Sequence, residues 1–332
     1  MNDQEEIQGL SATGRITRWE DMPRPIVCLA PMDGITDSAY RRIVRGFSQD
    51  VVLFSEFTNA DGFLRSDRVR SRLDYRPEEH PYFVQLFGNK PQSFAEASRA
   101  LADLGVAGID INMGCPAKKI VASQHGSGLM QDVKQACRIV EAVANAVSIQ
   151  VSVKTRLGWK DDSGLVHFTK RLVDAGASMI TIHGRTYDQN FSGQANWTPI
   201  YDLKEHLSVP LLGNGDVTDV IDGHQRLGPL DGFMIGRGAI GNPWAFLPHP
   251  WQHKPSLLER VEVIKRHYGF MLESKSPRRA LLEFRKHLSG YLRDIPYVKP
   301  FRAKLMTAPD EDTLFALLDD LAQRLPGEAE AC

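Results

Sequence analysis

Eight short runs of apolar residues recur along the chain, and longer segments with a different spacing separate them. Most of these runs are continuous rather than alternating, as in Val51-Val52-Leu53-Phe54, which is typical of parallel strands buried on both faces. The predicted strands are Ile26–Ala30, Val51–Phe57, Tyr82–Phe87, Gly108–Asn112, Ile149–Lys154, Met179–His183, Val209–Gly213 and Gly232–Ile235.

The segments between these runs carry apolar residues at helical spacing. The clearest predicted helices are Ser93–Leu104, Val133–Val147 and Leu165–Asp174, and a glycine follows the first and the last as a helix stop. Strands that alternate with helices indicate βα units, and eight units predict a closed α/β fold, the (β/α)8 or TIM barrel. An open, doubly wound sheet is the alternative that the same alternation allows.

The pattern changes after about residue 240. Four prolines in Pro243–Ser256 favour a linker, and beyond it the chain is helical without strand-like runs. The helix predicted at Arg278–Arg293 carries one apolar stripe, made of Leu281, Phe284, Leu288 and Leu292. We therefore expect an N-terminal extension (1–24), a barrel domain (25–246) and a smaller all-helical C-terminal domain (247–332).

Charge is distributed unevenly along the 332 residues, although the whole chain has a net charge of only -1. Residues 254–304 contain 13 Lys and Arg against five Asp and Glu, a local net charge of +8, whereas residues 307–332 carry seven acids and one Arg. A basic helical face suits the phosphates of a nucleic acid, with Arg278, Arg285 and Lys286 as candidate contacts. A merely solvated helix surface is the alternative.

The same composition argues against several classes of protein. The four cysteines, Cys28, Cys115, Cys137 and Cys332, form no Cys-x-x-Cys pair and no cluster with zinc spacing, so we expect neither a metal site nor disulfides. The first ten residues are acidic and polar, unlike a signal peptide, and no apolar run is long enough to cross a bilayer. A soluble cytoplasmic protein is the expectation.

Polar or reactive residues follow most of the predicted strands. In a barrel the carboxyl ends of all strands meet at one face, so we expect these residues to surround a common site. They are Pro31, Met32 and Asp33 after strand one, Gln85 in strand three, Asn112 to Pro116 after strand four, Lys154 to Arg156 at the end of strand five, His183 to Thr186 after strand six, Asn214, Gly215 and Asp216 after strand seven, and Gly236 to Gly238 after strand eight.

The two glycine-containing loops after strands seven and eight predict a phosphate site. Glycines let backbone N–H groups approach phosphate oxygens, and Arg237 adds a charge-assisted partner. Tight turns that need positive φ are the alternative explanation of these glycines. Lys154 ends an apolar strand and needs an anion or polar partner, either a reduced flavin or a structural carboxylate.

Cys115 is the most reactive of the candidate residues. It lies in a Gly-Cys-Pro turn just past a strand, and an ordinary thiol with a pKa of about 8.5 is protonated near neutrality. Such a group suits a general acid, although a thiol with a depressed pKa would be a nucleophile instead. We assign no function to the other cysteines, and we expect His183 and Gln85 to donate hydrogen bonds to a ring system.

These motifs resemble the tRNA-dihydrouridine synthase family, and its bacterial B-type branch most. The resemblance is strong over about residues 25–246 and looser to about residue 306. It rests on Ala30-Pro31-Met32-Asp33-Gly34-Ile35-Thr36-Asp37, on Asp110-Ile111-Asn112-Met113-Gly114-Cys115-Pro116-Ala117-Lys118-Lys119, on Thr181-Ile182-His183-Gly184-Arg185-Thr186, on Asn214-Gly215-Asp216 and on Met234-Ile235-Gly236-Arg237-Gly238.

The resemblance implies an FMN-dependent, NADPH-driven reduction of one uridine in the D-loop of tRNA. Hydride would go from reduced FMN to C6 of the uracil, and Cys115 would protonate C5. Asn112 and Arg185 would lie near the substrate. The implied FMN contacts are Pro31, Met32, Asp33, Gln85, Lys154, His183, Asn214, Gly215, Asp216, Gly236 and Arg237.

One motif departs from the family, because Gly126-Ser127-Gly128-Leu129-Met130 stands where Gly-Ser-Ala-Leu-Leu is usual. Two other functions remain possible on the residues alone. One is an FMN barrel enzyme acting on a free pyrimidine such as dihydroorotate, which would not need the basic helices. The other is a non-catalytic RNA-binding protein on a barrel that binds no flavin.

Overall fold

The computed structural model describes residues 18–248, 254–295 and 298–324. Eight parallel strands form the barrel, and the pairing of β1 with both β2 and β9, together with that of β2 with β4, closes it. This closure confirms the predicted barrel and excludes the open sheet. The barrel strands are β1 (Ile26–Leu29), β2 (Val52–Phe54), β4 (Tyr82–Phe87), β5 (Gly108–Asn112), β6 (Gln150–Arg156), β7 (Met179–His183), β8 (Leu211–Asn214) and β9 (Gly232–Ile235).

The observed strands agree with the predicted ones apart from their ends. β2 stops at Phe54, and just beyond it the side-chain oxygen Ser55 Oγ accepts the hydrogen bond from Gln85 N. A separate two-residue strand, β3 (Thr58–Asn59), then pairs with the end of β4. β6 runs two residues further than predicted and so carries Arg156 as well as Lys154.

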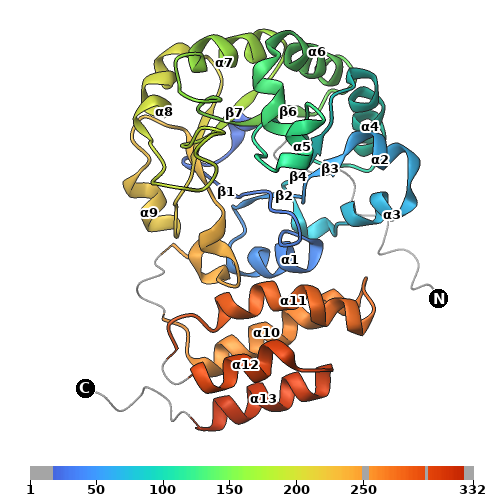
Figure 1. The fold of residues 1–332 in the computed structure, drawn as a ribbon, viewed down its shortest axis with the longest axis vertical. Helices are drawn as coiled ribbons and strands as arrows, with labels where there is room; N and C mark the ends of the chain where they lie inside the picture. The colour runs from blue at the N-terminus through green and yellow to red at the C-terminus, as the bar shows by residue number, and fades with distance from the viewer. Residues whose placement is uncertain (1–17, 249–253, 296–297, 325–332) are drawn as a thin grey trace, which may run out of the picture.

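Helices surround the barrel and connect its strands (Figure 1). Three of them begin at an aspartate whose carboxylate accepts hydrogen bonds from the first turn: Asp37 for α1, Asp132 for α6 and Asp219 for α9. The bounds are α1 (Ser38–Phe47), α2 (Ala60–Arg65), α3 (Asp67–Arg70), α4 (Pro91–Asp103), α5 (Lys118–Ala122), α6 (Val133–Ala144), α7 (Leu165–Asp174), α8 (Thr198–Leu203) and α9 (Val220–Gln225).

Two apolar clusters form the core. The larger one fills the space between strands and helices and continues into the C-terminal helices. The smaller one lies in the barrel, where Trp19, from the segment before β1, stacks on Phe83 with ring centroids 4.5 Å apart. Trp19 belongs to the predicted N-terminal extension, whose first 17 residues lie outside the described part of the chain.

Four further helices form a group beneath the barrel in Figure 1: α10 (Leu257–Leu272), α11 (Pro277–Tyr291), α12 (Lys299–Thr307) and α13 (Glu311–Arg324). The predicted stripe of Leu281, Phe284, Leu288 and Leu292 is buried. The linker prediction is wrong at its start, because Pro243–Phe246 is a 3-10 helix that buries Trp244 and Phe246. Pro250 of that segment and the end of the acidic tail, 325–332, lie outside the described residues.

The helical domain and the barrel meet in a close junction beside α1. Lys275 bridges Asp37 of the barrel and Glu283 of α11, with 2.8 Å between Lys275 Nζ and the Glu283 carboxylate. The backbones of Gly241 and Gly290 approach so closely that a Cβ on Gly290 would collide with the carbonyl of Ile240. The junction therefore combines a largely buried ion triad with direct backbone packing.

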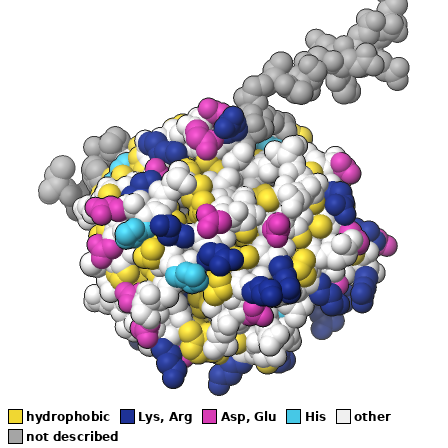
Figure 2. All heavy atoms as spheres, turned by 90° about the horizontal axis from the view of Figure 1, so that it is seen from above, with side chains coloured by type: hydrophobic (Ala, Val, Ile, Leu, Met, Phe, Trp, Pro, Cys, Tyr) yellow, Lys and Arg dark blue, Asp and Glu magenta, His cyan; other side chains and the backbone are white. Residues whose placement is uncertain are grey.

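Charged side chains of both signs are mixed on the outer surface of the barrel (Figure 2). On the barrel face remote from the helical domain, Lys and Arg alternate with Asp and Glu, with apolar side chains between them (Figure 2). None of the helices in the described part of the chain has the length and apolar character that crossing a membrane requires.

Replacing Lys275 with Met should destabilise the fold by about 2–4 kcal/mol, because the largely buried Asp37 loses its cation, whereas Glu283 keeps Arg279. Burial alone would raise the pKa of Asp37, but Lys275 and nearby histidines lower it to about 2. A lowered folded-state pKa stabilises the protein above about pH 4, and this contribution fades as the pH falls towards 2. Urea unfolding should therefore show the full loss near pH 6 and a smaller one near pH 3.

Lys170→Met is the matched control, because Lys170 is exposed on α7. It should change the free energy of unfolding by less than about 0.5 kcal/mol. Equal stability of the wild type and Lys275→Met at pH 6 would contradict the stabilising role of the triad.

Candidate active site

A cavity of about 670 Å³ opens at the carboxyl ends of the barrel strands. The candidate catalytic residue, the eleven candidate cofactor contacts and Asn112 all line it. Four candidate substrate contacts, Arg185, Arg278, Arg285 and Lys286, are not among its lining residues. The lining comprises Ala30, Pro31, Met32, Asp33, Phe57, Gln85, Asn112, Gly114, Cys115, Pro116, Lys154, Arg156, His183, Phe191, Asn214, Gly215, Asp216, Val217, Thr218, Gly236, Arg237, Gly238 and Arg293.

A chain of side-chain hydrogen bonds orients the loop that carries Cys115. Ser152 Oγ and Gln85 Nε2 each donate to the Asp110 carboxylate at 2.6 Å. With its amide N–H group turned to Asp110, Gln85 presents Oε1 to Asn112 Nδ2 at 2.8 Å. Asn112 Oδ1 is then left to accept from the backbone N–H groups of Gly114 at 3.1 Å and Cys115 at 2.9 Å.

This chain depends on Asp110 acting as an acceptor. Burial raises the pKa of Asp110 to about 6, and the hydrogen bonds from Ser152 and Gln85 limit the rise. Near neutral pH the group is therefore ionised and accepts both bonds. The orientation of each amide follows from that charge, and the last amide holds the turn at Cys115.

Cys115 itself is held as a neutral thiol. Burial raises its pKa above the ordinary value, although the Ala117 backbone N–H and the nearby Arg156 guanidinium oppose the rise. A raised pKa keeps the proton on Sγ at neutral pH. The thiol therefore suits the delivery of a proton better than nucleophilic attack.

Lys154 and His183 converge on the side chain of Asn214. Asn214 Nδ2 donates to the carbonyl of Met234 at 3.0 Å, which turns Oδ1 towards the cavity. Lys154 Nζ donates to that oxygen at 2.9 Å, and His183 Nδ1 lies 3.0 Å from it. The partner of Lys154 is thus an amide, and not the structural carboxylate that the sequence left open.

The charges of this group favour an anionic ligand. Burial and the neighbouring Arg156 lower the pKa of Lys154 to about 8, so its ammonium form persists at neutral pH. Burial and Lys154 also lower the pKa of His183 well below its ordinary value. His183 is therefore neutral, and because Asn214 offers an acceptor, the imidazole proton is on Nδ1.

Arg185 lies behind the cavity wall, although it was a candidate substrate contact. Its guanidinium is buried and pairs with Asp216 at 2.7 Å, and it also donates to the carbonyls of Ser192 and Gly193. Arg237 pairs with the other oxygen of Asp216 at 3.0 Å. Arg185 thus positions the loop after β8 rather than reaching into the cavity.

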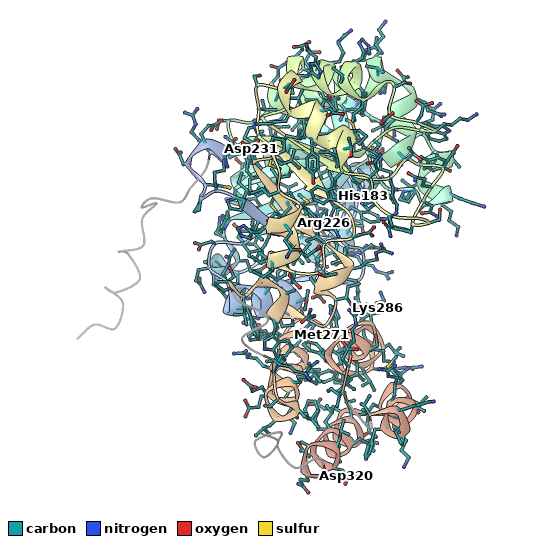
Figure 3. The ribbon with its side chains drawn as sticks, turned by 90° about the vertical axis from the view of Figure 1, so that its left-hand side faces the viewer. His183, Arg226, Asp231, Met271, Lys286 and Asp320 are labelled. Carbon is teal, nitrogen blue, oxygen red and sulfur yellow. The ribbon has the colours of Figure 1, made fainter. Side chains whose placement is uncertain are left out.

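The candidate residues of α11 occupy three different environments. Lys286 reaches the barrel, where its ammonium packs against Gly34 beside the cavity loop after β1 (Figure 3). Arg285 donates to the carbonyl of Ala308 within the helical domain, and Arg278 is exposed. Arg293, just after α11, is the residue by which the helical domain lines the cavity.

Several residues of the site were assigned no role from the sequence. Arg156 was among the polar residues at the strand ends, and it shares the face of Lys154 because it follows that residue by two positions. Asp110 does not line the cavity but orients Gln85, and it stood out in the sequence as a carboxylate inside an apolar strand. Phe57 and Phe191 are loop aromatics without a distinguishing pattern, and Arg293 reaches the cavity only through the docking of the helical domain.

The residues present fit a flavin mononucleotide. Asn214 to Thr218 and Gly236 to Gly238 line the cavity after β8 and β9, where backbone N–H groups and the Arg237 guanidinium, which also pairs with Asp216, would meet a phosphate. Lys154 offers a cation to a ring that becomes anionic on reduction. A metal centre has no comparable support, because the described residues contain no group of three His, Cys, Asp or Glu side chains placed to hold an ion.

Comparison with known proteins identifies the family of the chain. A family model described as dihydrouridine synthase matches residues 28–325. The chain is 36% identical to a probable tRNA-dihydrouridine synthase 1 of Synechocystis sp., over 84% of this chain and 81% of that protein. It is also 36% identical to tRNA-dihydrouridine synthase B of Xanthomonas axonopodis pv. citri, over 89% and 92% of the two chains.

A solved structure of a 2-naphthoyl-CoA reductase in complex with 2-naphthoyl-CoA resembles the fold alone. Its TM-score is 0.51 at 11% identity, over 68% of this chain and 49% of that one.

The raised pKa of Cys115 predicts slow alkylation. Near pH 8 Cys115 should react with iodoacetamide more slowly than glutathione, and its rate should still climb with pH after that of glutathione has levelled off, since only the thiolate reacts. Asn112→Ala removes the acceptor of two loop N–H groups, so it should speed the reaction and cost about 1–3 kcal/mol of stability. Peptide mass spectrometry separates Cys115 from Cys137, whose modification rate serves as the internal control.

Reaction of wild-type Cys115 at least as fast as glutathione near pH 8 would refute the neutral thiol. An Asn112→Ala protein with unaltered Cys115 reactivity would refute the orienting role of the amide.

Proposed function

The chain belongs to the dihydrouridine synthase family, and from that premise we propose that it reduces the C5–C6 bond of a uridine in tRNA with FMN and NADPH. The observation that carries the proposal is the half-buried thiol of Cys115 in the wall of a cavity that also gathers Lys154, His183 and Asn214. The names of the similar Synechocystis and Xanthomonas proteins support tRNA as the substrate.

In this proposal the strand ends bind FMN. The loops after β8 and β9, with Arg237, hold its phosphate, and Lys154 and His183 meet the ring. When bound, FMN supplies the hydride that goes to C6 of the uracil. Gln85 can offer the flavin only one hydrogen bond. Its amide already donates one N–H to Asp110 and accepts from Asn112, which leaves one N–H for a ligand.

Cys115 supplies the proton at C5. Its Sγ–H is neutral before the reaction, so transfer leaves a thiolate, which the nearby Arg156 guanidinium stabilises. Arg156 donates through Nε to the carbonyl of Gly114 at 2.7 Å, so the same side chain fixes the loop and supplies the charge. Solvent returns the proton to Sγ after the product leaves.

The RNA approaches from the side of the helical domain. A uridine must leave its stack to enter a cavity at the barrel mouth, which costs a few kcal/mol. Arg293 at the cavity and Lys286 beside Gly34 bring positive charge to that entrance, where the phosphates of the extruded nucleotide would pass.

Replacing Cys115 with Ala should abolish dihydrouridine formation while leaving FMN bound. The loss should be at least about a hundredfold, the usual contribution of a positioned general acid. Cys137→Ala, a cysteine that bonds to the Arg171 carbonyl away from the cavity, should retain full activity. Mass spectrometry of tRNA after incubation with NADPH measures the product, and the flavin spectrum measures the cofactor.

The alternatives predict other outcomes of the same assay. Full turnover by Cys115→Ala would refute the acid assignment. Oxidation of NADPH with free uracil or dihydroorotate as fast as with tRNA would favour an enzyme of free pyrimidines. A protein purified without flavin that cannot be reconstituted with FMN would favour a non-catalytic RNA-binding protein.

Binding of tRNA should weaken steeply between about 50 and 200 mM salt, as phosphate contacts require. Lys286→Gln should weaken binding and lower the slope of log K against log salt by about one, the effect of one lost phosphate contact. Lys170→Gln, with the same change of charge on α7, should leave both unchanged. A flat salt response, or equal effects of the two variants, would contradict RNA binding at this entrance.

A further inference from the structure

Phe191 is an aromatic residue that the cavity leaves exposed. Its side chain lies in the loop between β7 and α8 and is 52% exposed while lining the cavity. Three other large apolar side chains, Leu104, Leu258 and Leu282, are as exposed in the described part of the chain, but none of them lines the cavity. An exposed aromatic ring at a cavity mouth is a natural contact for a flat ligand.

Two guanidinium groups flank the ring of Phe191. The Cζ atoms of Arg156 and Arg237 lie 5.5 and 5.4 Å from the ring centroid, within cation–π range. His183 meets the ring edge-on, with centroids 6.5 Å apart. The ring thus sits between the loop of Cys115, to which Arg156 is bonded, and the predicted phosphate loops, to which Arg237 belongs.

The position of Phe191 is built into the loop. Arg156 Nη1 donates to the carbonyls of Thr186 and Asn190, at 3.1 and 2.8 Å, on the N-terminal side of Phe191. On its other side Arg185 donates to the carbonyls of Ser192 and Gly193. Two buried arginines therefore hold the backbone on both sides of Phe191, whose own side chain is half exposed.

We propose that Phe191 is a stacking residue for a nucleobase of the RNA substrate at the mouth of the cavity. The inference rests on the proposed function and adds a contact to it. A base offers a flat face to an aromatic ring, and stacking of this kind tolerates any base. The positive charge of Arg156 and Arg237 beside the ring would also attract the phosphates that accompany the base.

A nucleobase fits this place better than the flavin ring does. The groups expected to meet the flavin, Gln85, Lys154 and Asn214, belong to the strand ends, and Gln85 and Asn214 are buried. Phe191 instead comes from a loop beyond the strand end and is half exposed. A ring that rests on Phe191 therefore lies on the solvent side of the cavity, where RNA must enter.

The test compares Phe191→Leu and Phe191→Trp with the wild type as FMN-loaded full-length proteins. Loss of one base–aromatic stack should raise both the KM and the Kd for tRNA by about tenfold in Phe191→Leu. Phe191→Trp keeps a larger ring and should stay within about threefold of the wild type. Flavin retention, and the anaerobic rate of its reduction by NADPH, should change less than about twofold in both variants.

Leu104→Ala is the matched control, an exposed apolar side chain at the end of α4 that should alter none of these quantities. An unaltered KM and Kd for tRNA in Phe191→Leu would overturn the proposal. Slower reduction by NADPH with unaltered tRNA binding would also overturn it, since the nicotinamide ring would then occupy the place. Equal increases of KM and Kd in the Leu and Trp variants would show a structural role of Phe191 and would also overturn the proposal.

The Kd also separates the two proposals. A wild-type protein that binds tRNA but forms no dihydrouridine would refute the proposed function, yet the ratio of Kd values for Phe191→Leu and the wild type would still decide the stacking contact.

Discussion

The two hydrogen bonds that Asn112 Oδ1 accepts from Gly114 and Cys115 determine what the site can do. An amide could equally present its N–H group, and the loop N–H groups would then lose their acceptor. The buried charge of Asp110 decides the choice, because it accepts from Gln85 and so orients both amides in turn. A carboxylate on one strand thus sets the position of a thiol on the loop beyond it.

The electrostatic character of the cavity follows from a second constraint. Lys154, Arg156 and Arg237 bring positive charge to one wall, and burial lowers the pKa of Lys154 to about 8 and that of Arg156 to about 10. Such cations are costly to bury without an anion. A bound phosphate and a ring that gains negative charge would relieve that cost, and a thiolate at Cys115 would be stabilised by the same field.

The barrel, the C-terminal helices and most of the cavity wall were predictable from the sequence, because strand ends converge in any closed barrel. The sequence could not show which hydrogen-bond or ion-pair partner each polar side chain has in the folded protein. Arg185 was expected to contact the substrate, but its guanidinium pairs with Asp216 instead. The amide of Gln85 likewise bonds to Asp110 and Asn112. Arg293 becomes part of the cavity only because Lys275 and the Gly241–Gly290 contact dock the helical domain against the barrel.

We propose that the chain reduces uridine in tRNA with the oriented Cys115 thiol as the proton donor. Mass mapping of dihydrouridine in tRNA from cells that lack this protein tests it most directly. The account predicts that a D-loop uridine loses the mass of the two added hydrogens, and that the wild-type gene restores it while an Asn112→Ala gene does so poorly. An unaltered map in the cells without the protein would contradict the account.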